Sequence, residues 1–88
     1  MKVTIPSPLY SYTGQQRQVA AGGATLRELL ADLELQFPGI RFRMIDEQDQ
    51  VREHIRIFIN GQLSTDLSAP LTDRDVVQII TSISGGDL

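Results

Sequence analysis

The sequence predicts an α+β roll in which a mixed sheet of four to five strands packs on one helix. Segments with strand-like patterns lie before and after a single helical segment, so one helix must cover one face of the sheet. The chain has 88 residues, too few for a larger doubly wound sheet. Its 41% hydrophobic and 22% charged residues are typical of one folded globular domain.

The first strands are predicted on either side of two prolines. Residues 2–5 alternate polar and apolar side chains, and Pro6 and Pro8 then interrupt the pattern. A polar-rich run over 15–20 ends in two apolar residues and predicts the second strand of a hairpin. Gly22-Gly23 predicts a turn after it.

The helix is predicted to begin after Thr25. Glu28 follows at the spacing of a capping box, in which each side chain accepts a hydrogen bond from a free backbone N–H at the start of the helix. Pro38-Gly39 ends the helix. Between these signals, apolar side chains recur at helical spacing and form one stripe that faces the core: Leu26, Leu29, Leu30, Leu33 and Phe37.

The clearest strand covers residues 54–60, where alternation is strict. Side chains of Ile55, Ile57 and Ile59 are predicted to face the core, and those of His54, Arg56, Phe58 and Asn60 to face the opposite way. Asn60-Gly61 is typical of a tight turn, so a short return strand is expected at Gln62-Leu63.

The remaining segments are a loop and a last strand. Residues 40–53 have no clean period and are predicted to form a long loop with a short helical turn. Residues 76–83 are β-branched and nearly continuous, which predicts a central strand covered on both faces, or mostly so. We expect a domain over 1–83, followed by a tail over 84–88. The residues expected in its core are Leu29, Leu30, Leu33, Ile57 and Ile79.

Composition argues against several functions. Eleven Asp plus Glu against eight Lys plus Arg give a net charge of -3, without the basic stripe that nucleic-acid binding requires. No apolar stretch is long enough to cross a membrane, and the first residues lack the apolar region of a signal peptide, so a cytoplasmic protein is expected. The chain has no cysteine and therefore no disulfide, Cys-based metal site or thiol nucleophile.

No catalytic or metal-binding set emerges from the residues, so the chain is not predicted to be an enzyme or to bind a cofactor itself. His54 is the one histidine, and an ordinary place on the polar face of its strand is expected. Asp46, Glu47 and Asp49 lack the glycine and distal glutamate of a calcium loop, so they are interpreted as a solvated loop. The serines do not lie in an elbow motif typical of a nucleophile.

Arg56 and Phe58 are candidates for binding a partner. The register of their strand places both on the face opposite the helix. Arginine and aromatic side chains often anchor protein interfaces. The alternative is that Phe58 is a single exposed apolar residue, or is covered by the long loop, and the sequence leaves both interpretations open.

Gly85-Gly86 is the most informative pair in the chain. It follows a predicted strand and precedes no further element, so a turn there would connect nothing. Residues without side chains form a thin strip that can pass through a narrow channel and bring a carboxylate to a buried reactive centre. Ser84 and Gly85 would thread such a channel ahead of Gly86.

The chain resembles the small β-grasp sulfur carriers of the MoaD/ThiS/CysO group over essentially its whole length. The resemblance implies a ubiquitin-like β-grasp fold in which the last strand is central and parallel to the first. The segments that carry it are Ala24-Thr25-Leu26-Arg27-Glu28-Leu29-Leu30, Phe37-Pro38-Gly39-Ile40, Ile57-Phe58-Ile59-Asn60-Gly61, and Asp73-Arg74-Asp75-Val76-Val77-Gln78-Ile79-Ile80 leading to Gly85-Gly86.

The resemblance also implies a mechanism. In such carriers the carboxylate of the final glycine, here Gly86, is adenylated with ATP by an E1-like enzyme of the MoeB/ThiF type. A sulfur donor then displaces AMP and leaves a thiocarboxylate, which a sulfur-accepting synthase uses. The chain is expected to be the carrier and substrate, while the partner supplies the catalytic groups and magnesium.

The sequence departs from the family pattern at three places. Arg74 stands where glycine is common, and Thr81 where proline is common. Asp87-Leu88 follows the glycine pair, so the Gly86 carbonyl is held in an amide and cannot be adenylated. Some relatives carry a short extension that a JAMM-type zinc protease removes, so cleavage between Gly86 and Asp87 is predicted to activate the chain.

Two other functions stay open at this point. The chain could be a non-covalent ubiquitin-like binding module that works through the face of Arg56 and Phe58 and leaves the tail unused. It could also be a covalent modifier, in which the same activated tail is joined to protein lysines. Neither depends on a different fold, because the same β-grasp architecture hosts many roles.

Overall fold

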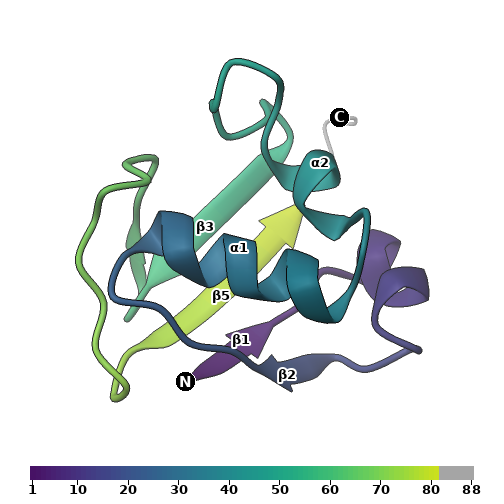
Figure 1. Ribbon diagram of the computed structural model, residues 1–88, viewed down its shortest axis with the longest axis horizontal. Coiled ribbons are helices and arrows are strands. Elements are labelled where there is room, and N and C mark those ends of the chain that lie inside the picture. Colours follow the sequence, from purple (N-terminus) through teal and green to yellow (C-terminus); the bar gives the residue numbers. More distant parts are fainter. Residues whose placement is uncertain (82–88) are drawn as a thin grey trace.

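The computed structural model describes residues 1–81, which form a five-stranded sheet with one long helix lying across a face of it (Figure 1). The predicted α+β architecture is confirmed. The strands are β1 (Lys2–Thr4), β2 (Gln18–Ala20), β3 (Ile55–Ile59), β4 (Gln62–Leu63) and β5 (Val76–Thr81). The helices are the 3₁₀ helix η1 (Ser7–Tyr12), the long helix α1 (Leu26–Gln36) and the short helix α2 (Ile40–Met44).

The strands lie in the order β2-β1-β5-β3-β4, so β5 is at the centre of the sheet. It runs parallel to β1, with Val77 opposite Val3, and antiparallel to β3, with Ile79 opposite Ile57. The sheet is therefore mixed, as predicted, because the other neighbouring strands are antiparallel. The first and last described strands are hydrogen-bonded to each other in the middle of the molecule.

The core lies between the sheet and the apolar stripe of α1. Leu26, Leu29, Leu30 and Leu33 are all buried on the helix side. The inward side chains of the strands meet them, and all five residues expected in the core are buried. Burying one such aliphatic side chain contributes about 1.5–3 kcal/mol relative to leaving it in water, so this layer supplies most of the driving force for folding.

The start of α1 is capped nearly as predicted. The Thr25 hydroxyl accepts a hydrogen bond from the Glu28 backbone N–H at 3.2 Å. The Glu28 carboxylate accepts from the backbone N–H of Ala24 at 3.0 Å, one residue before the position that a capping box would use. The helix ends at Gln36, and Gly39 follows in the left-handed conformation, with φ of 96°.

The prediction that the last strand is covered on both faces is wrong. Side chains of β5 alternate between buried and exposed, and only Val77 and Ile79 of its apolar residues are buried. Val76 and Ile80 remain 41% and 45% exposed on the opposite face. The strand is central because of its hydrogen bonds, while α1 covers one face of the sheet alone.

The segment 40–53 contains the predicted short helical turn, but its acidic part is more ordered than a solvated loop. It begins with α2, whose Ile40 and Met44 are buried. Asp49 then accepts from Arg27 of α1 at 3.0 Å and from Arg41 of α2 at 3.2 Å. These hydrogen bonds hold the pKa of the Asp49 carboxyl below its ordinary value, and the one that Arg41 donates has the larger effect. The acidic segment therefore joins two helices instead of being only a solvated loop.

Several boundaries differ from the predictions. The turn before β3 contains His54, so His54 is not a strand residue as expected. The second strand begins at Gln18 instead of residue 15, and η1 fills part of the interval after Pro6. Within residues 1–81, no helix has the length and apolar character needed to cross a membrane. The predicted boundary between domain and tail lies outside the described residues.

Candidate functional site

Strand β5 carries the chain to the predicted tail. β1 pairs with it along Val76–Gln78, and β3 pairs with it as far as Thr81, which lies opposite Ile55. Thr81 is half-buried and is the last described residue. The predicted tail residues Ser84, Gly85, Gly86 and Asp87 lie outside the described residues. The described part of β5 therefore leads toward the predicted tail from the centre of the sheet.

Arg56 and Phe58 lie on the sheet face opposite α1, where the alternation predicted them. Ile55 and Ile57, on either side of Arg56, are buried under the helix, whereas Arg56 is exposed and Phe58 is half-buried. Cross-strand pairing extends this region, which we call the outer sheet face. Its members are Arg56 and Phe58 of β3, Val76, Gln78 and Ile80 of β5, and Leu63 of β4.

The outer sheet face combines apolar surface with one fixed guanidinium. Arg56 lies opposite Ile80, and Phe58 lies opposite both Gln78 and Leu63. Arg56 Nη1 donates to the backbone carbonyl of Glu53 at 2.7 Å, which holds the side chain along the sheet. Isolated exposed apolar residues are common, but here several adjoin across three strands, which is the arrangement of a protein-binding surface.

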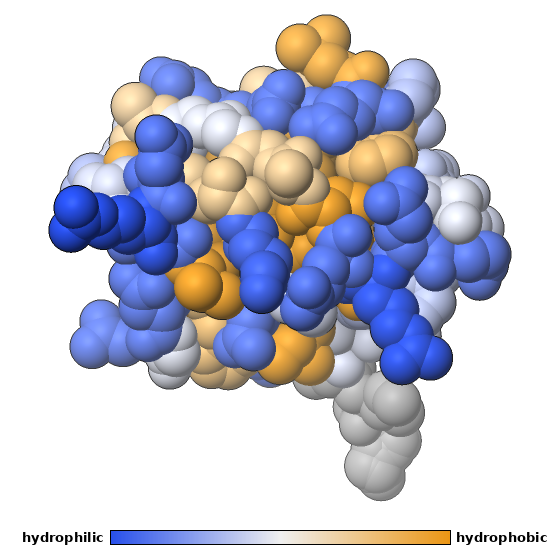
Figure 2. Space-filling model, turned by 90° about the horizontal axis from the view of Figure 1, so that it is seen from below, coloured by the Kyte–Doolittle hydropathy of each residue, from blue (hydrophilic) through white to orange (hydrophobic). Residues whose placement is uncertain are grey.

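The side of the molecule near β1 and β2 has a mixed surface. Seen from below, on the side of the β1 and β2 edge, hydrophilic side chains cover most of the surface and apolar surface shows between them (Figure 2). Among residues 1–81, no group of three or more His, Asp or Glu side chains is placed to hold a metal ion. The exposed carboxylates already described serve local structure, as Asp49 does between its two arginines.

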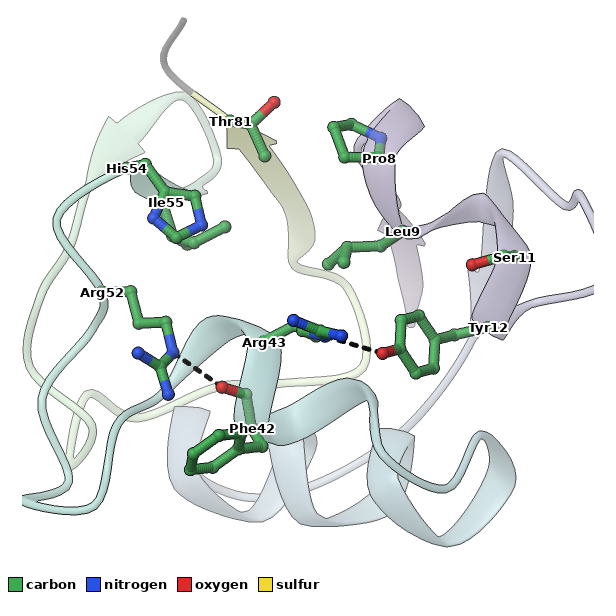
Figure 3. Close-up of a pocket in the computed structure, with 10 residues that line it drawn as sticks. All are labelled: Pro8, Leu9, Ser11, Tyr12, Phe42, Arg43, Arg52, His54, Ile55 and Thr81. Atoms are coloured by element: carbon green, nitrogen blue, oxygen red, sulfur yellow. Dashed lines mark hydrogen bonds between the residues drawn. The ribbon is translucent and has the colours of Figure 1, made fainter. Parts of the chain in front are cut away.

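A pocket of about 600 Å³ lies beside Thr81 of β5, and no sequence pattern predicted it. The pocket is surrounded by three parts of the chain (Figure 3): η1 with Leu9 and Tyr12, α2 with Phe42 and Arg43, and the segment before β3. Thr81 and His54 lie on its rim at the end of the sheet. These elements are far apart in sequence, so no local pattern could have brought their side chains together.

Two arginines of the pocket are held in place by neighbouring groups. Arg43 Nε donates to the Tyr12 hydroxyl at 2.7 Å, and its guanidinium carbon lies 5.9 Å from the centre of the Tyr12 ring. The hydrogen bond that Arg43 donates to Tyr12 raises the pKa of Arg43 further above its ordinary value, so the group stays charged. Arg52 Nε donates to the Phe42 carbonyl at 2.7 Å, and its guanidinium carbon lies 4.5 Å from the centre of the Phe42 ring.

Comparison with known proteins gives one family. The model of the ThiS family matches residues 3–86. The sulfur carrier protein CysO of Mycobacterium tuberculosis is 34% identical to the chain, and the alignment covers 96% of each protein. CysO of Mycobacterium bovis matches with the same identity and coverage.

Solved structures agree with the sequence comparison. CysO in a crystal structure of the Amycolatopsis orientalis BexX/CysO complex has a TM-score of 0.88 and 32% identity, covering 97% of this chain and 98% of that one. Mycobacterium tuberculosis CysO has a TM-score of 0.87 and 31% identity, covering 93% and 98%. Small archaeal modifier protein 1 of H. volcanii, at 21% identity and a TM-score of 0.76 over 94% and 97%, shares the ubiquitin-like β-grasp fold.

Proposed function

The chain belongs to the ThiS family, and from this premise we propose that it is a sulfur carrier whose reactive group is the carboxylate of Gly86. The observation that carries the proposal is the extent of the family match, which continues past the described residues and ends at Gly86. The CysO relatives, whose names describe them as sulfur carriers, match over 96% of each chain and support the same role.

The proposed chemistry takes place in two steps on a partner enzyme of the E1-like MoeB/ThiF type. An oxygen of the Gly86 carboxylate forms a bond to the α-phosphorus of ATP, and pyrophosphate leaves with the electrons of the broken P–O bond. A sulfide-level donor then attacks the acyl carbon, and AMP leaves with the electrons of the broken C–O bond. The product is a thiocarboxylate on Gly86.

The partner enzyme has to supply the catalytic groups in this scheme. It binds ATP and magnesium and accepts the tail, while this chain is substrate and carrier. A free carboxylate is a poor acyl donor, because its negative charge repels nucleophiles, and the acyl adenylate removes that charge and provides a good leaving group. A sulfur-accepting synthase would then take the sulfur from the thiocarboxylate.

Activation requires a free carboxylate at Gly86. In the sequence Asp87-Leu88 follows, so the Gly86 carbonyl is part of a peptide bond. We propose that a JAMM-type zinc protease cleaves between Gly86 and Asp87 before adenylation. The outer sheet face, with Arg56 and Phe58, would bind one or more of these partners. The Amycolatopsis orientalis relative, solved as a BexX/CysO complex, supports the expectation that carriers of this shape bind another protein.

The test compares three forms of the protein: the full chain, a form that ends at Gly86, and that form with Gly86→Val. Each is incubated with ATP, magnesium, sulfide and the MoeB/ThiF-type enzyme of its host, and the intact mass is measured. The form ending at Gly86 is expected to gain the mass difference between sulfur and oxygen. The full chain and the Gly86→Val form are expected to stay unchanged.

Each other result has a defined meaning. Charging of the full chain without trimming would refute the cleavage step. No charging of any form would refute the carrier proposal and favour the non-covalent binding module. Recovery of the chain in isopeptide linkage to lysines of host proteins would favour the covalent modifier.

A further inference from the structure

The pocket beside Thr81 has the charge of an anion-binding site. The cationic side chains that line it are those of Arg43 and Arg52, and none of its 10 lining residues, all within residues 1–81, carries a carboxylate. The chain as a whole has a net charge of -3, so the positive character of this region is local and opposes the overall balance. A pocket of this kind attracts a negatively charged group in spite of the charge on the rest of the molecule.

The arginines of the pocket differ from those that stabilise the fold. Arg27 and Arg41 both pair with the Asp49 carboxylate. In the described part of the chain, neither Arg43 nor Arg52 forms an ion pair. Arg43 is held by the Tyr12 hydroxyl and Arg52 by the Phe42 carbonyl, and both of these acceptors are neutral. Each guanidinium is therefore oriented through Nε without being neutralised, and its terminal nitrogens can donate to a carboxylate.

The side chains that line the pocket are closely packed against the rest of the fold. Tyr12 packs against the start of α2 so closely that a side-chain carbon on Gly39 would lie 3.1 Å from its ring. Leu9 and Ile55 are buried and form an apolar part of the lining. Fixed donors beside an apolar wall reduce the entropy cost of binding and suit a ligand that carries both a carboxylate and an apolar group.

We propose that this pocket binds an acidic segment of the enzyme that adenylates Gly86, with a carboxylate between Arg43 and Arg52. The inference rests on the proposed function and names part of the docking contact. Thr81, the last described residue of β5, lines the pocket. An enzyme that encloses the residues after Thr81 must therefore approach this rim. An Asp or Glu side chain of that enzyme would neutralise the charges of Arg43 and Arg52, which form no ion pair with any described residue.

The experiment measures binding of the form that ends at Gly86 to the host MoeB/ThiF-type enzyme by calorimetry, at low and high salt. Arg43→Gln and Arg52→Gln remove one charge each, and the doubly substituted protein removes both. Arg74→Gln is the matched control, because Arg74 is exposed in the turn before Val76, at the other end of β5. Each pocket substitution is expected to raise Kd about tenfold, while the control leaves it unchanged.

Two further readouts separate charge from folding. A protein that carries Arg43→Lys and Arg52→Lys keeps both positive charges and is expected to recover part of the affinity, whereas a loss of structure would not be rescued. The dependence of Kd on salt should become less steep in the doubly substituted Gln protein, because two charge contacts are gone. Kd values for the pocket variants that equal the Arg74→Gln value would overturn the inference.

The outcomes also distinguish this inference from the proposed function. If the wild-type tail is charged but Kd is the same with and without the two arginines, the proposed function stands and the docking site is refuted. Binding that depends on the arginines without any charging of Gly86 would support the site and refute the carrier mechanism. Absence of both binding and charging would refute both.

Discussion

The side-chain amide of Asn60 donates to Asp75 Oδ1 at 2.9 Å and thereby joins the turn after β3 to the turn before β5. The amide oxygen of Asn60 also accepts from the Val76 backbone N–H at 2.9 Å, and Asp75 Oδ2 accepts from the Thr72 N–H at 2.8 Å. Asn60 has a φ of 52°, a left-handed conformation that asparagine tolerates better than most residues. The two turns thus align β3 with the strand that leads to the tail.

These contacts predict a loss of stability in acid. Hydrogen bonds from Asn60 and then Thr72 lower the pKa of the Asp75 carboxyl below its ordinary value of 3.8. The unfolded chain therefore binds this proton more readily, and the stabilisation is present above pH 3.8 and is lost as pH falls through the lower folded-state pKa. Chemical denaturation across this pH range is expected to show a shallower loss of stability for Asp75→Asn than for the wild-type protein.

The control for this experiment is Asp73→Asn, two residues away. Within residues 1–81 the Asp73 side chain has no hydrogen-bond partner, whereas Asp75 has two. At neutral pH the Asp75 variant should be the less stable of the two, since a neutral amide cannot accept from both neighbours as well as a carboxylate does. An Asp75 variant with the same acid profile as the wild-type protein would contradict the assignment.

Local signals predicted the helix and the succession of strands along the chain well. Thr25, Glu28 and the leucine stripe determine where α1 begins and which side it buries, because capping and helical spacing act within a few residues. The prediction that β5 is covered on both faces was wrong for a physical reason. Val76 and Ile80 are β-branched apolar residues that favour a strand, but residue type does not determine whether the opposite face has a covering layer.

The pocket could not be predicted for a related reason. Tyr12 and Arg43 are 31 residues apart, and their contact exists only because η1 packs on α2. The segment 40–53 also lacked a periodic pattern, since α2 is a single short helix and the acidic residues after it are held by non-local arginines. The register of β3 did predict the place of Arg56 and Phe58, because alternation along one strand is local.

A pair of leucines on α1 tests the position of the core. Leu33 is fully buried against the sheet, whereas Leu35 is 82% exposed on the same helix. Leu33→Ala is expected to lower the free energy of unfolding by about 2–5 kcal/mol, because it removes apolar contacts and leaves a cavity. Leu35→Ala makes the same chemical change in water and should leave stability nearly unaltered. Equal effects in urea denaturation would show that α1 does not bury the predicted side.

Two adjacent glycines test how closely the chain approaches the start of α1. A side-chain carbon on Gly23 would lie 2.5 Å from the Leu29 backbone nitrogen, so the backbone would have to move. At Gly22 nothing lies within 4 Å of that position. Gly23→Ala is expected to destabilise the fold by about 1–3 kcal/mol, the usual cost of overpacking. Thermal unfolding should separate it clearly from Gly22→Ala, and a Gly23→Ala protein as stable as Gly22→Ala would contradict this packing.

The last prediction concerns the outer sheet face. Phe58 lies between Leu63 and Gln78 on the face opposite α1. If this face docks the adenylating enzyme, Phe58→Ala removes an aromatic anchor and should raise Kd for that enzyme about tenfold or more. Leu35→Ala is the matched control, since it truncates an exposed apolar side chain on the helix and should leave Kd unchanged. Binding is measured below the unfolding temperature of each variant. Unaltered affinity of the folded Phe58→Ala protein would place docking on another surface.

A protein that carries both Phe58→Ala and Arg43→Gln tests whether the outer sheet face and the pocket bind the same enzyme. If both do so independently, the two losses of binding free energy should add.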